Sequence, residues 1–414
     1  MTESAAEEAV AEARPGWRRD VAIFLSGQTI SMFGSLLVQY AIVWHLTLLT
    51  QSGWVLTAAI LFGMVPQAVV SIFGGVFADR MNRRLLIIVS DGAIAVTTLI
   101  LAVLMMAGYQ ELWLIFLTLT IRSVGAGFQQ PAAAAVIPQL TPADQLMRVN
   151  GIFQTIQSAM MLVAPAAAAA IYASMSIVAI FFVDVVTAVI GIGLLLLIAI
   201  PTVRSAAGGA GYLHDLKEGL RYSFSHARIR WVLAVLALVM ILGAAPSYLT
   251  PLLIVRSFGE EVWLLTVNEL AFSIGMLLAG LAVAALGDRI RRKALVIVVF
   301  TVVFGIANLG LGLSPDVWIF FAFMFVCGAS VPFLSTPSTV ILQERVEPEY
   351  LGRVFGLVGV VMALAMPLGM VILGPLADVV SVESLIITCG VLTFIAIAIA
   401  SIVPSGRQAL ADPR

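Results

Sequence analysis

The chain has 414 residues, of which 61% are hydrophobic and only 11% are charged. A soluble domain carries about 25% charged residues, so this composition excludes a soluble enzyme and indicates a protein embedded in lipid. The formal net charge of −1 provides no bulk attraction for nucleic acid or for another strongly charged partner.

Long apolar runs, separated by charged or turn-rich breaks, predict twelve membrane-spanning helices. A helix needs roughly 20 mostly apolar residues to cross a bilayer, and it satisfies its backbone hydrogen bonds internally. The runs lack the polar and apolar alternation of barrel strands, so we expect an all-α membrane protein. The expected spans are 21–47, 55–78, 85–107, 112–131, 149–173, 177–200, 231–255, 263–286, 294–313, 317–342, 354–377 and 385–403. Prolines inside several spans, Pro246 and Pro251 among them, predict bends.

The polar segments divide the chain into two halves of six spans. Residues 1–20 lack the apolar core and cleavage site of a signal peptide, so they are expected to form a tail before an uncleaved span. Residues 201–230 are Gly-rich and then amphipathic, which is typical of a linker. The expected order is a tail at 1–20, a six-helix bundle at 21–200, the linker at 201–230, a second six-helix bundle at 231–404 and a tail at 405–414.

The positions of lysine and arginine predict the orientation of the spans. Of the 22 such residues, all except Arg122 and Arg256 fall on the tails, the linker or the loops that follow even-numbered spans. Positive charge collects on the cytoplasmic side, so both termini and the linker are expected to be cytoplasmic. The seven tryptophans fall at predicted span ends, which is typical of an aromatic belt at the membrane surface.

Two sequence patterns occur once in each half. FADRMNRRLLI at 77–87 is matched by LGDRIRRKALV at 286–296, and PADQLMRVNG at 142–151 is matched by PEYLGRVFG at 348–356. Both pairs lie at equivalent positions among the spans. This repetition predicts two pseudo-symmetric six-helix bundles in parallel orientation.

The motif GGVFADRMNRR at 74–84 resembles the signature of the major facilitator superfamily, and it lies in the loop where that family carries it. IRSVGAGFQQPA at 121–132, LAFSIGMLLAG at 270–280 and PEYLGRVFGLVG at 348–359 resemble the macrolide-efflux branch, which also includes siderophore exporters. The resemblance covers nearly the whole chain. Ala284 replaces the equivalent of Gly75, and Asn82 stands where many relatives have glycine.

The two signature loops are candidates for gating. Gly75 would let two helices approach closely, and Asp79 at a helix end could pair with a neighbouring helix N-terminus or an arginine. An alternative for the basic residues is that they fix topology and contact anionic lipid. The candidate gating residues are Gly75, Asp79, Arg80, Arg83, Asp288, Arg289 and Arg292.

Four ionisable residues lie at membrane depth: Asp91, Arg122, Asp184 and Glu269. Charge there is costly and normally faces a partner or a wet cavity. The first three could form a neutralised structural network or a proton site. Glu269 could carry a proton, bind a cationic substrate amine or lie solvated in a shallow outer vestibule.

Uncharged polar residues within the spans are candidates for a substrate cavity. Gln154 and Gln157 are three residues apart and share a helix face, and Gln39 and Asn268 lie on other spans. Hydrogen bonding between helices is an equally good explanation for these side chains. No GxxxxGK[ST] loop, catalytic triad or metal-ligand constellation stands out, so we expect no enzyme activity, cofactor or metal.

The resemblance implies a secondary transporter of the bacterial cytoplasmic membrane that exports hydrophobic or amphipathic molecules by proton antiport with alternating access. Macrolide-like drugs are the leading substrate class, with a siderophore or endogenous metabolite as the alternative. A non-transporting sensor or scaffold is a third possibility. The expected partners are the small-molecule substrate, protons and membrane lipid, without nucleic acid, and a monomer is expected to function.

Overall fold

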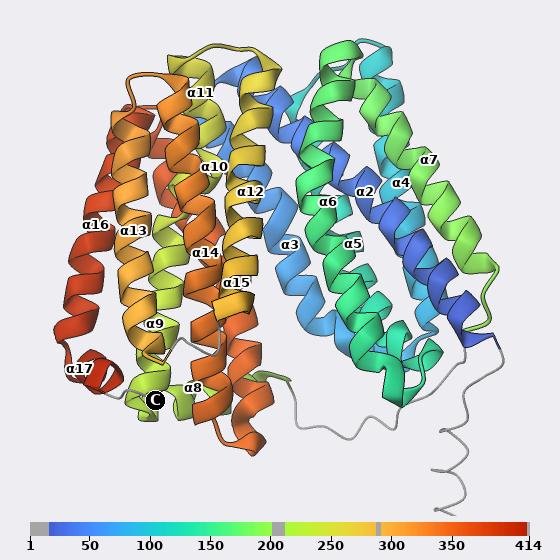
Figure 1. The fold of residues 1–414 in the computed structure, drawn as a ribbon. Coiled ribbons are helices and arrows are strands. Elements are labelled where there is room, and N and C mark those ends of the chain that lie inside the picture. The colour runs from blue at the N-terminus through green and yellow to red at the C-terminus, as the bar shows by residue number, and fades with distance from the viewer. Residues whose placement is uncertain (1–15, 201–211, 287–290, 412–414) are drawn as a thin grey trace, which may run out of the picture. The chain divides into compact units, whose positions relative to one another are not determined.

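A computed structural model of the chain consists of α-helices joined by short links, with one 3₁₀ turn (Figure 1). The structure describes residues 16–200, 212–286 and 291–411, and within these ranges the side chains of 72–80 and 212–216 are not described. These ranges contain no β-strand. The fold is therefore the predicted all-α membrane architecture.

The first half of the chain forms six long helices, whose bounds lie close to the predicted spans. They are α2 (Trp17–Thr50), α3 (Gly53–Arg80), α4 (Arg83–Met106), α5 (Leu112–Leu140), α6 (Leu146–Ser174) and α7 (Ile177–Leu196), with the 3₁₀ turn η1 (Ala143–Gln145) before α6. Helix α5 continues through Pro131, where the predicted span ended, and through Pro138. Transmembrane helices tolerate such prolines because neighbouring groups satisfy the freed carbonyls.

The second half begins with α8, the amphipathic part of the predicted linker, and contains shorter helices as well as long ones. They are α8 (Tyr212–Ser225), α9 (Ala227–Leu242), α10 (Ala244–Tyr248), α11 (Thr250–Ser257), α12 (Val262–Leu286), α13 (Lys293–Leu313), α14 (Val317–Arg345), α15 (Pro348–Leu376), α16 (Val382–Ile402) and α17 (Pro404–Ala411).

The predicted seventh span is divided into α9, α10 and α11. Helix α9 ends at Leu242 with Gly243 as its C-cap, Pro246 lies within α10, and Pro251 stands in the first turn of α11. Proline lacks a backbone N–H and its ring obstructs the preceding turn, so each of these positions favours a break in the helix. In the described ranges, eleven helices are long and apolar enough to cross a membrane, or twelve if Lys217–Ser225 and Ala227–Leu242, bent by 112°, count as one span.

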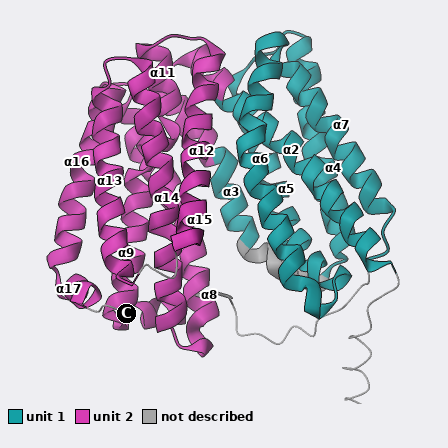
Figure 2. Cartoon of the chain, viewed as in Figure 1, with its two compact units in different colours: residues 1–43, 62–208 teal, residues 44–61, 209–414 magenta. Residues whose placement is uncertain are grey.

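The helices form two compact units (Figure 2). Unit 1 contains residues 1–43 and 62–208, and unit 2 contains residues 44–61 and 209–414. The end of α2 and the start of α3 thus pack with the second half of the chain, whereas the rest of both helices belongs to unit 1.

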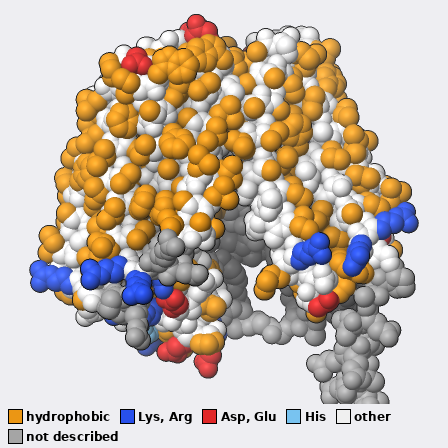
Figure 3. All heavy atoms as spheres, in the orientation of Figure 1, with side chains coloured by type: hydrophobic (Ala, Val, Ile, Leu, Met, Phe, Trp, Pro, Cys, Tyr) orange, Lys and Arg blue, Asp and Glu red, His pale blue; other side chains and the backbone are white. Residues whose placement is uncertain are grey.

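Apolar side chains cover the long sides of the helices, as a lipid-facing surface requires (Figure 3). The tryptophan belt is only partly present. Trp54, Trp113, Trp263 and Trp318 are exposed and Trp17 is half-buried, but Trp44 and Trp231 are buried within the protein. The indole of Trp231 donates a hydrogen bond to the Ala400 carbonyl at 2.8 Å, so its position at a span end reflects packing rather than contact with the membrane surface.

Helices α12 and α14 in unit 2 cross at two glycines. A Cβ atom at Gly275 would lie 2.2 Å from the Phe325 carbonyl oxygen, and one at Gly328 would lie 2.0 Å from the Phe272 carbonyl oxygen. Neither backbone atom can move aside cheaply. Lipid tails are as apolar as the helices, so close van der Waals packing of this kind is a main source of helix association in a membrane.

We therefore predict that Gly328→Ala lowers the stability of the protein, because the added methyl group must push α12 and α14 apart. Overpacking of this kind costs about 1–3 kcal/mol. The matched control is Gly280→Ala on α12, where a Cβ meets nothing within 4 Å and the better helix propensity of alanine contributes up to about 1 kcal/mol. Thermal unfolding in detergent measures both, and equal midpoints for the two variants would contradict the packing argument.

Candidate functional site

Unit 1 brings together three of the ionisable residues predicted to lie at membrane depth. Asp91 is on α4, Arg122 is on α5 and Asp184 is on α7. The guanidinium of Arg122 forms an ion pair with the Asp184 carboxylate, and the side chains of the two residues are only 11% and 2% exposed. Asp91 is buried as well and lies close enough to Asp184 for their charges to interact.

Neutral groups complete the surroundings of the guanidinium. The same Arg122 nitrogen donates to the Thr98 hydroxyl, and its other terminal nitrogen lies 3.5 Å from the Ser35 carbonyl oxygen. Thr98 is fully buried and gives its own proton to the Ile94 carbonyl at 2.9 Å, which leaves its oxygen lone pairs for the arginine. Four helices, α2, α4, α5 and α7, therefore contribute to one polar cluster, which we call the Arg122 cluster.

Glycine at position 34 makes room for this cluster between α2 and α7. A Cβ atom at Gly34 would lie 2.0 Å from the Thr187 hydroxyl oxygen and 3.0 Å from an oxygen of the Asp184 carboxylate. The Thr187 hydroxyl donates to the Asp184 backbone carbonyl at 2.9 Å. A larger side chain at position 34 would therefore push against Thr187 and Asp184 and disturb the ion pair with Arg122.

The Arg122 cluster contains two carboxylates and one guanidinium. With both carboxylates ionised it carries one uncompensated negative charge, and with one proton bound it is neutral. Burial in low dielectric makes an uncompensated charge costly, so uptake of a proton and uptake of a cation are the two ways to neutralise the cluster.

The predicted polar residues of the second half lie beside the broken seventh span. Asn268 on α12 is fully buried, and its amide nitrogen is 3.5 Å from the Thr250 hydroxyl at the start of α11. Within the described residues the Asn268 amide oxygen has no hydrogen-bond partner. Glu269 is half-buried, interacts electrostatically with Tyr248 at the end of α10, and has no described lysine or arginine within ion-pair distance.

The candidate cavity glutamines form no hydrogen bond, between described residues, with the Arg122 cluster or with the polar residues beside the seventh span. Gln39 and Gln154 are exposed, and Gln157 is half-buried. A different glutamine pair forms a helix contact instead: the Gln129 amide nitrogen on α5 donates to the Gln28 amide oxygen on α2 at 2.7 Å. A ligand-binding role for Gln39, Gln154 and Gln157 stays a prediction.

Most of the candidate gating residues lie outside the described side chains, namely Gly75, Asp79, Arg80, Asp288 and Arg289.

Two residues of the signature loops are described. Arg83 donates to the Ala135 carbonyl of α5 at 2.8 Å, so it holds the start of α4 against that helix. Arg292 stands at the N-cap position of α13, and its side chain makes no capping hydrogen bond. A gating role for these two arginines stays a prediction.

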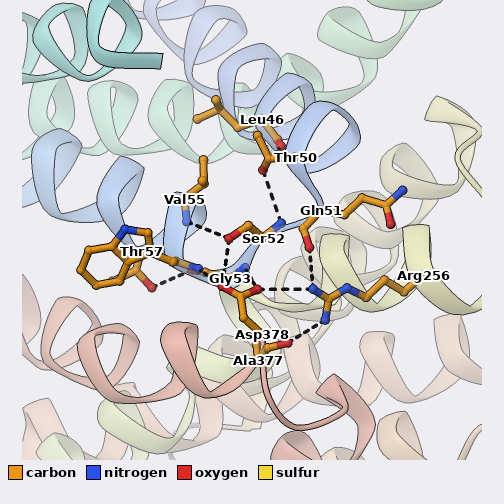
Figure 4. A network of polar contacts seen from close by, with 11 residues as sticks. Leu46, Thr50, Gln51, Ser52, Gly53, Val55, Thr57, Arg256, Ala377 and Asp378 are labelled. Atoms are coloured by element: carbon orange, nitrogen blue, oxygen red, sulfur yellow. Dashed lines mark hydrogen bonds and ion pairs between the residues drawn. The ribbon is translucent and has the colours of Figure 1, made fainter. Parts of the chain in front are cut away.

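A second polar cluster, which the sequence analysis did not identify, lies in unit 2 where α3 begins (Figure 4). The carboxylate of Asp378, just past α15, accepts hydrogen bonds from the backbone N–H groups of Gly53 and Trp54 at 2.7 and 2.9 Å and from the Ser52 hydroxyl at 2.9 Å. Arg256 of α11 lies 3.4 Å from the same carboxylate. These five residues form the Asp378 network.

The physical basis of the Asp378 network is the positive end of a helix dipole. The first N–H groups of α3 have no partner within the helix, and a carboxylate placed there satisfies two of them. Burial of the carboxyl acts to raise its pKa, but the four donors outweigh burial and hold the pKa of Asp378 below its usual value.

The link between α2 and α3 is held from α11 as well. The Arg256 guanidinium donates to the backbone carbonyl of Gln51 and, at 2.7 Å, to that of Ala377. Gln51 has a φ of 45°, a left-handed conformation that is uncommon for residues with a side chain. Its amide nitrogen donates to the Glu260 carboxylate at 2.8 Å. In the sequence, Arg256 was the one residue of this arrangement that stood out, because it is one of the two cations outside the predicted cytoplasmic side.

Known proteins match this chain over most of its length. The sequence model of the Major Facilitator Superfamily matches residues 20–268 and 263–411. Macrolide efflux protein A of Streptococcus pyogenes is 34% identical over 383 residues, which cover 91% of this chain and 94% of that protein. Macrolide efflux protein A of Enterococcus faecalis is 34% identical over 316 residues, which cover 75% of this chain and 97% of that protein.

Solved structures share the fold at low sequence identity. A POT family transporter in complex with 5-aminolevulinic acid has a TM-score of 0.75 and 12% identity, with 94% of this chain and 96% of that chain covered. A bacterial homolog of the human lysosomal transporter Spinster has a TM-score of 0.70 and 13% identity, with 97% and 99% covered.

We predict that Arg122→Leu destabilises the protein strongly, because it leaves Asp184 buried without its counter-charge. Removing one partner of a buried ion pair costs about 3–5 kcal/mol, whereas replacing both partners by apolar residues is often close to neutral. The double variant Arg122→Leu/Asp184→Leu should therefore unfold at a higher temperature than the single one in detergent. Lys293→Gln, which breaks the more exposed pair with Glu344, serves as the control and should cost at most about 1 kcal/mol. A double variant less stable than Arg122→Leu would contradict this assignment.

We also predict a defined pH dependence for the Asp378 network. Because the pKa of Asp378 is lowered on folding, its contribution is fully present above the unfolded value of about 3.9 and is lost as the pH falls through the lower folded value. Asp378→Ala should cost roughly 0.5–2 kcal/mol, as for other helix caps. The difference in unfolding temperature from wild type should stay constant between pH 8 and pH 5 and close only in stronger acid. A difference that already shrinks between pH 7 and pH 5 would show that the pKa is not lowered.

Proposed function

The chain belongs to the major facilitator superfamily, and we propose that it is a secondary active transporter that exports hydrophobic or amphipathic small molecules. Macrolides are the leading substrate class, proton antiport is the energy source, and transport proceeds by alternating access. The observation that carries the substrate class is the 34% identity to Macrolide efflux protein A across 91% of the chain.

The Arg122 cluster supports proton coupling. Arg122 compensates one carboxylate, which leaves one negative charge to be neutralised at membrane depth. A proton delivered from one side and released to the other would switch this cluster between a neutral and a charged state. The charged form of the cluster is costly unless water or substrate reaches it. The charged and neutral forms would therefore favour different conformations of the protein, in which the cluster is accessible or closed off.

Glu269 supports recognition of a cationic substrate. Its carboxylate is half-buried and lies beside the break between α10 and α11. Discontinuous spans of this kind commonly form substrate or ion sites in transporters, because their helix ends expose unpaired backbone groups. Macrolides carry an amine that is protonated at neutral pH, and Glu269 would pair with that amine.

The protein would lie in the bacterial cytoplasmic membrane with both termini in the cytoplasm, as the distribution of lysine and arginine favours. Its partners would be the exported molecule, protons and lipid, and one copy of the chain would complete the transport cycle without a cofactor.

The proposal is tested in proteoliposomes that contain the purified protein, a labelled macrolide and an imposed pH gradient. We predict gradient-driven uptake by wild type, its loss in Asp91→Asn, and a raised macrolide KM in Glu269→Gln. Asp91→Asn should still exchange labelled for unlabelled macrolide without a gradient, because substrate binding is intact. The control is Asp316→Asn, in which asparagine can replace aspartate as the cap of α14.

Three results would count against parts of this account. Gradient-driven uptake that persists in Asp91→Asn and in Asp184→Asn would exclude the Arg122 cluster as the coupling site. Uptake driven equally well by a sodium gradient would exclude strict proton coupling. If wild type transports no macrolide under any gradient, the substrate class is wrong, and siderophores and endogenous metabolites become the next candidates.

A further inference from the structure

A groove in unit 1 runs between the first part of α2 and the start of α6. It encloses about 700 Å³, within the range of about 300–1,000 Å³ that is usual for small-molecule sites. All its lining residues lie in residues 17–30 and 145–156, so it belongs to unit 1 alone. It is distinct from the Arg122 cluster, none of whose ionisable residues lines it.

The groove is amphipathic along its length. Arg18 and Arg148 stand where α2 and α6 begin, and both side chains are exposed. Deeper along the same helices, the walls are uncharged and mainly apolar. They include Leu25, Val149 and Ile156, with the hydroxyls of Ser26 and Thr29 among them. Charge is thus confined to one end, and that end lies at the side of the membrane where lysine and arginine collect.

The two guanidinium groups have no carboxylate partner in the described part of the chain. Arg18 lies over the Trp17 ring, 5.5 Å from its centroid, and Arg148 has no ion pair. Asp144, in the turn η1 just before α6, accepts a hydrogen bond from Gln145 at 2.8 Å and is exposed. Two exposed cations at the mouth of an apolar groove are complementary to an anion whose remainder is apolar.

The dimensions of the groove match one leaflet of a bilayer. From Arg18 to Ile30 the groove follows α2 for twelve residue steps, which is roughly 18 Å at 1.5 Å per residue. Half of a hydrocarbon core of about 30 Å is about 15 Å. A molecule with an anionic head at the arginines and an acyl chain along the wall would fit the groove in the orientation that the bilayer already imposes.

We propose that this groove is a binding site for an anionic phospholipid, with the head-group phosphate held by Arg18 and Arg148 and one acyl chain along Leu25, Val149 and Ile156. Basic pockets between membrane helices at this depth are suited to anionic head groups. The exported macrolide is excluded as the occupant, because its protonated amine would meet two guanidinium groups. A free anion is excluded because it would leave the apolar walls uncovered.

The test uses the quenching of Trp17 fluorescence by lipids that carry bromine on the acyl chain. Purified full-length protein in neutral detergent is titrated with brominated phosphatidylglycerol or brominated phosphatidylcholine, and the signal that disappears in Trp17→Phe is assigned to the groove. We expect phosphatidylglycerol to quench at much lower concentration than phosphatidylcholine. In Arg18→Gln/Arg148→Gln the phosphatidylglycerol midpoint should rise by roughly fivefold for each guanidinium removed.

Two further variants separate the head-group site from the chain site. Arg291→Gln/Arg407→Gln removes two other exposed cations, and it should leave the midpoint unchanged. Ser26→Phe fills the groove without a change in charge, and it should reduce the maximal quenching by phosphatidylglycerol.

Equal midpoints for the two lipids in wild type would overturn the proposal, as would a midpoint that does not respond to the loss of Arg18 and Arg148. Complete displacement of brominated phosphatidylglycerol by inorganic phosphate would also overturn it, because the site would then recognise a free anion rather than a lipid. None of these results depends on macrolide transport, so the test is independent of the proposed function.

Discussion

The buried charge of Arg122 is the constraint on which unit 1 depends. A guanidinium at membrane depth must be neutralised and hydrogen-bonded by the protein itself. The partners that satisfy it come from three other helices: the Asp184 carboxylate on α7, the Thr98 hydroxyl on α4 and a carbonyl on α2. These helices can converge only because Gly34 leaves space against Asp184. The packing of these four helices therefore depends on the same contacts that compensate the buried charge.

In unit 2, the polar groups at membrane depth are arranged differently from those of unit 1. Its seventh span is broken, and the break is joined to α12 through Thr250 and Asn268. Glu269 stands beside this break with no described cation to pair with. Unit 1 thus carries a cation that is already neutralised, and unit 2 carries a carboxylate that a cationic ligand could neutralise. This asymmetry is the basis for proposing proton binding in unit 1 and recognition of a substrate amine in unit 2.

The sequence was sufficient to predict the long helices from their apolar length. It also identified the three ionisable members of the Arg122 cluster from their depth, but not the Thr98 hydroxyl or the Ser35 carbonyl that complete it. It did not predict the division of the seventh span, since Pro246 and Pro251 indicate a bend without indicating where the helix restarts. Trp44 and Trp231 occupy span ends, but depth does not say which face of a helix is buried. The Asp378 network was missed because Asp378 is more than 300 residues from the start of α3 and 122 residues from Arg256, and no local pattern links a carboxylate to a distant helix N-terminus.

The most direct test of the central claim, that substrate and proton exchange for one another in this chain, is calorimetry of macrolide binding to the purified protein. The titration is performed at one pH in two buffers with different ionisation heats, so that any difference in heat measures protons released to the buffer. The account predicts proton release on macrolide binding by wild type and its loss in Asp91→Asn. Macrolide binding with the same heat in both buffers would show that no proton is exchanged and would contradict the account.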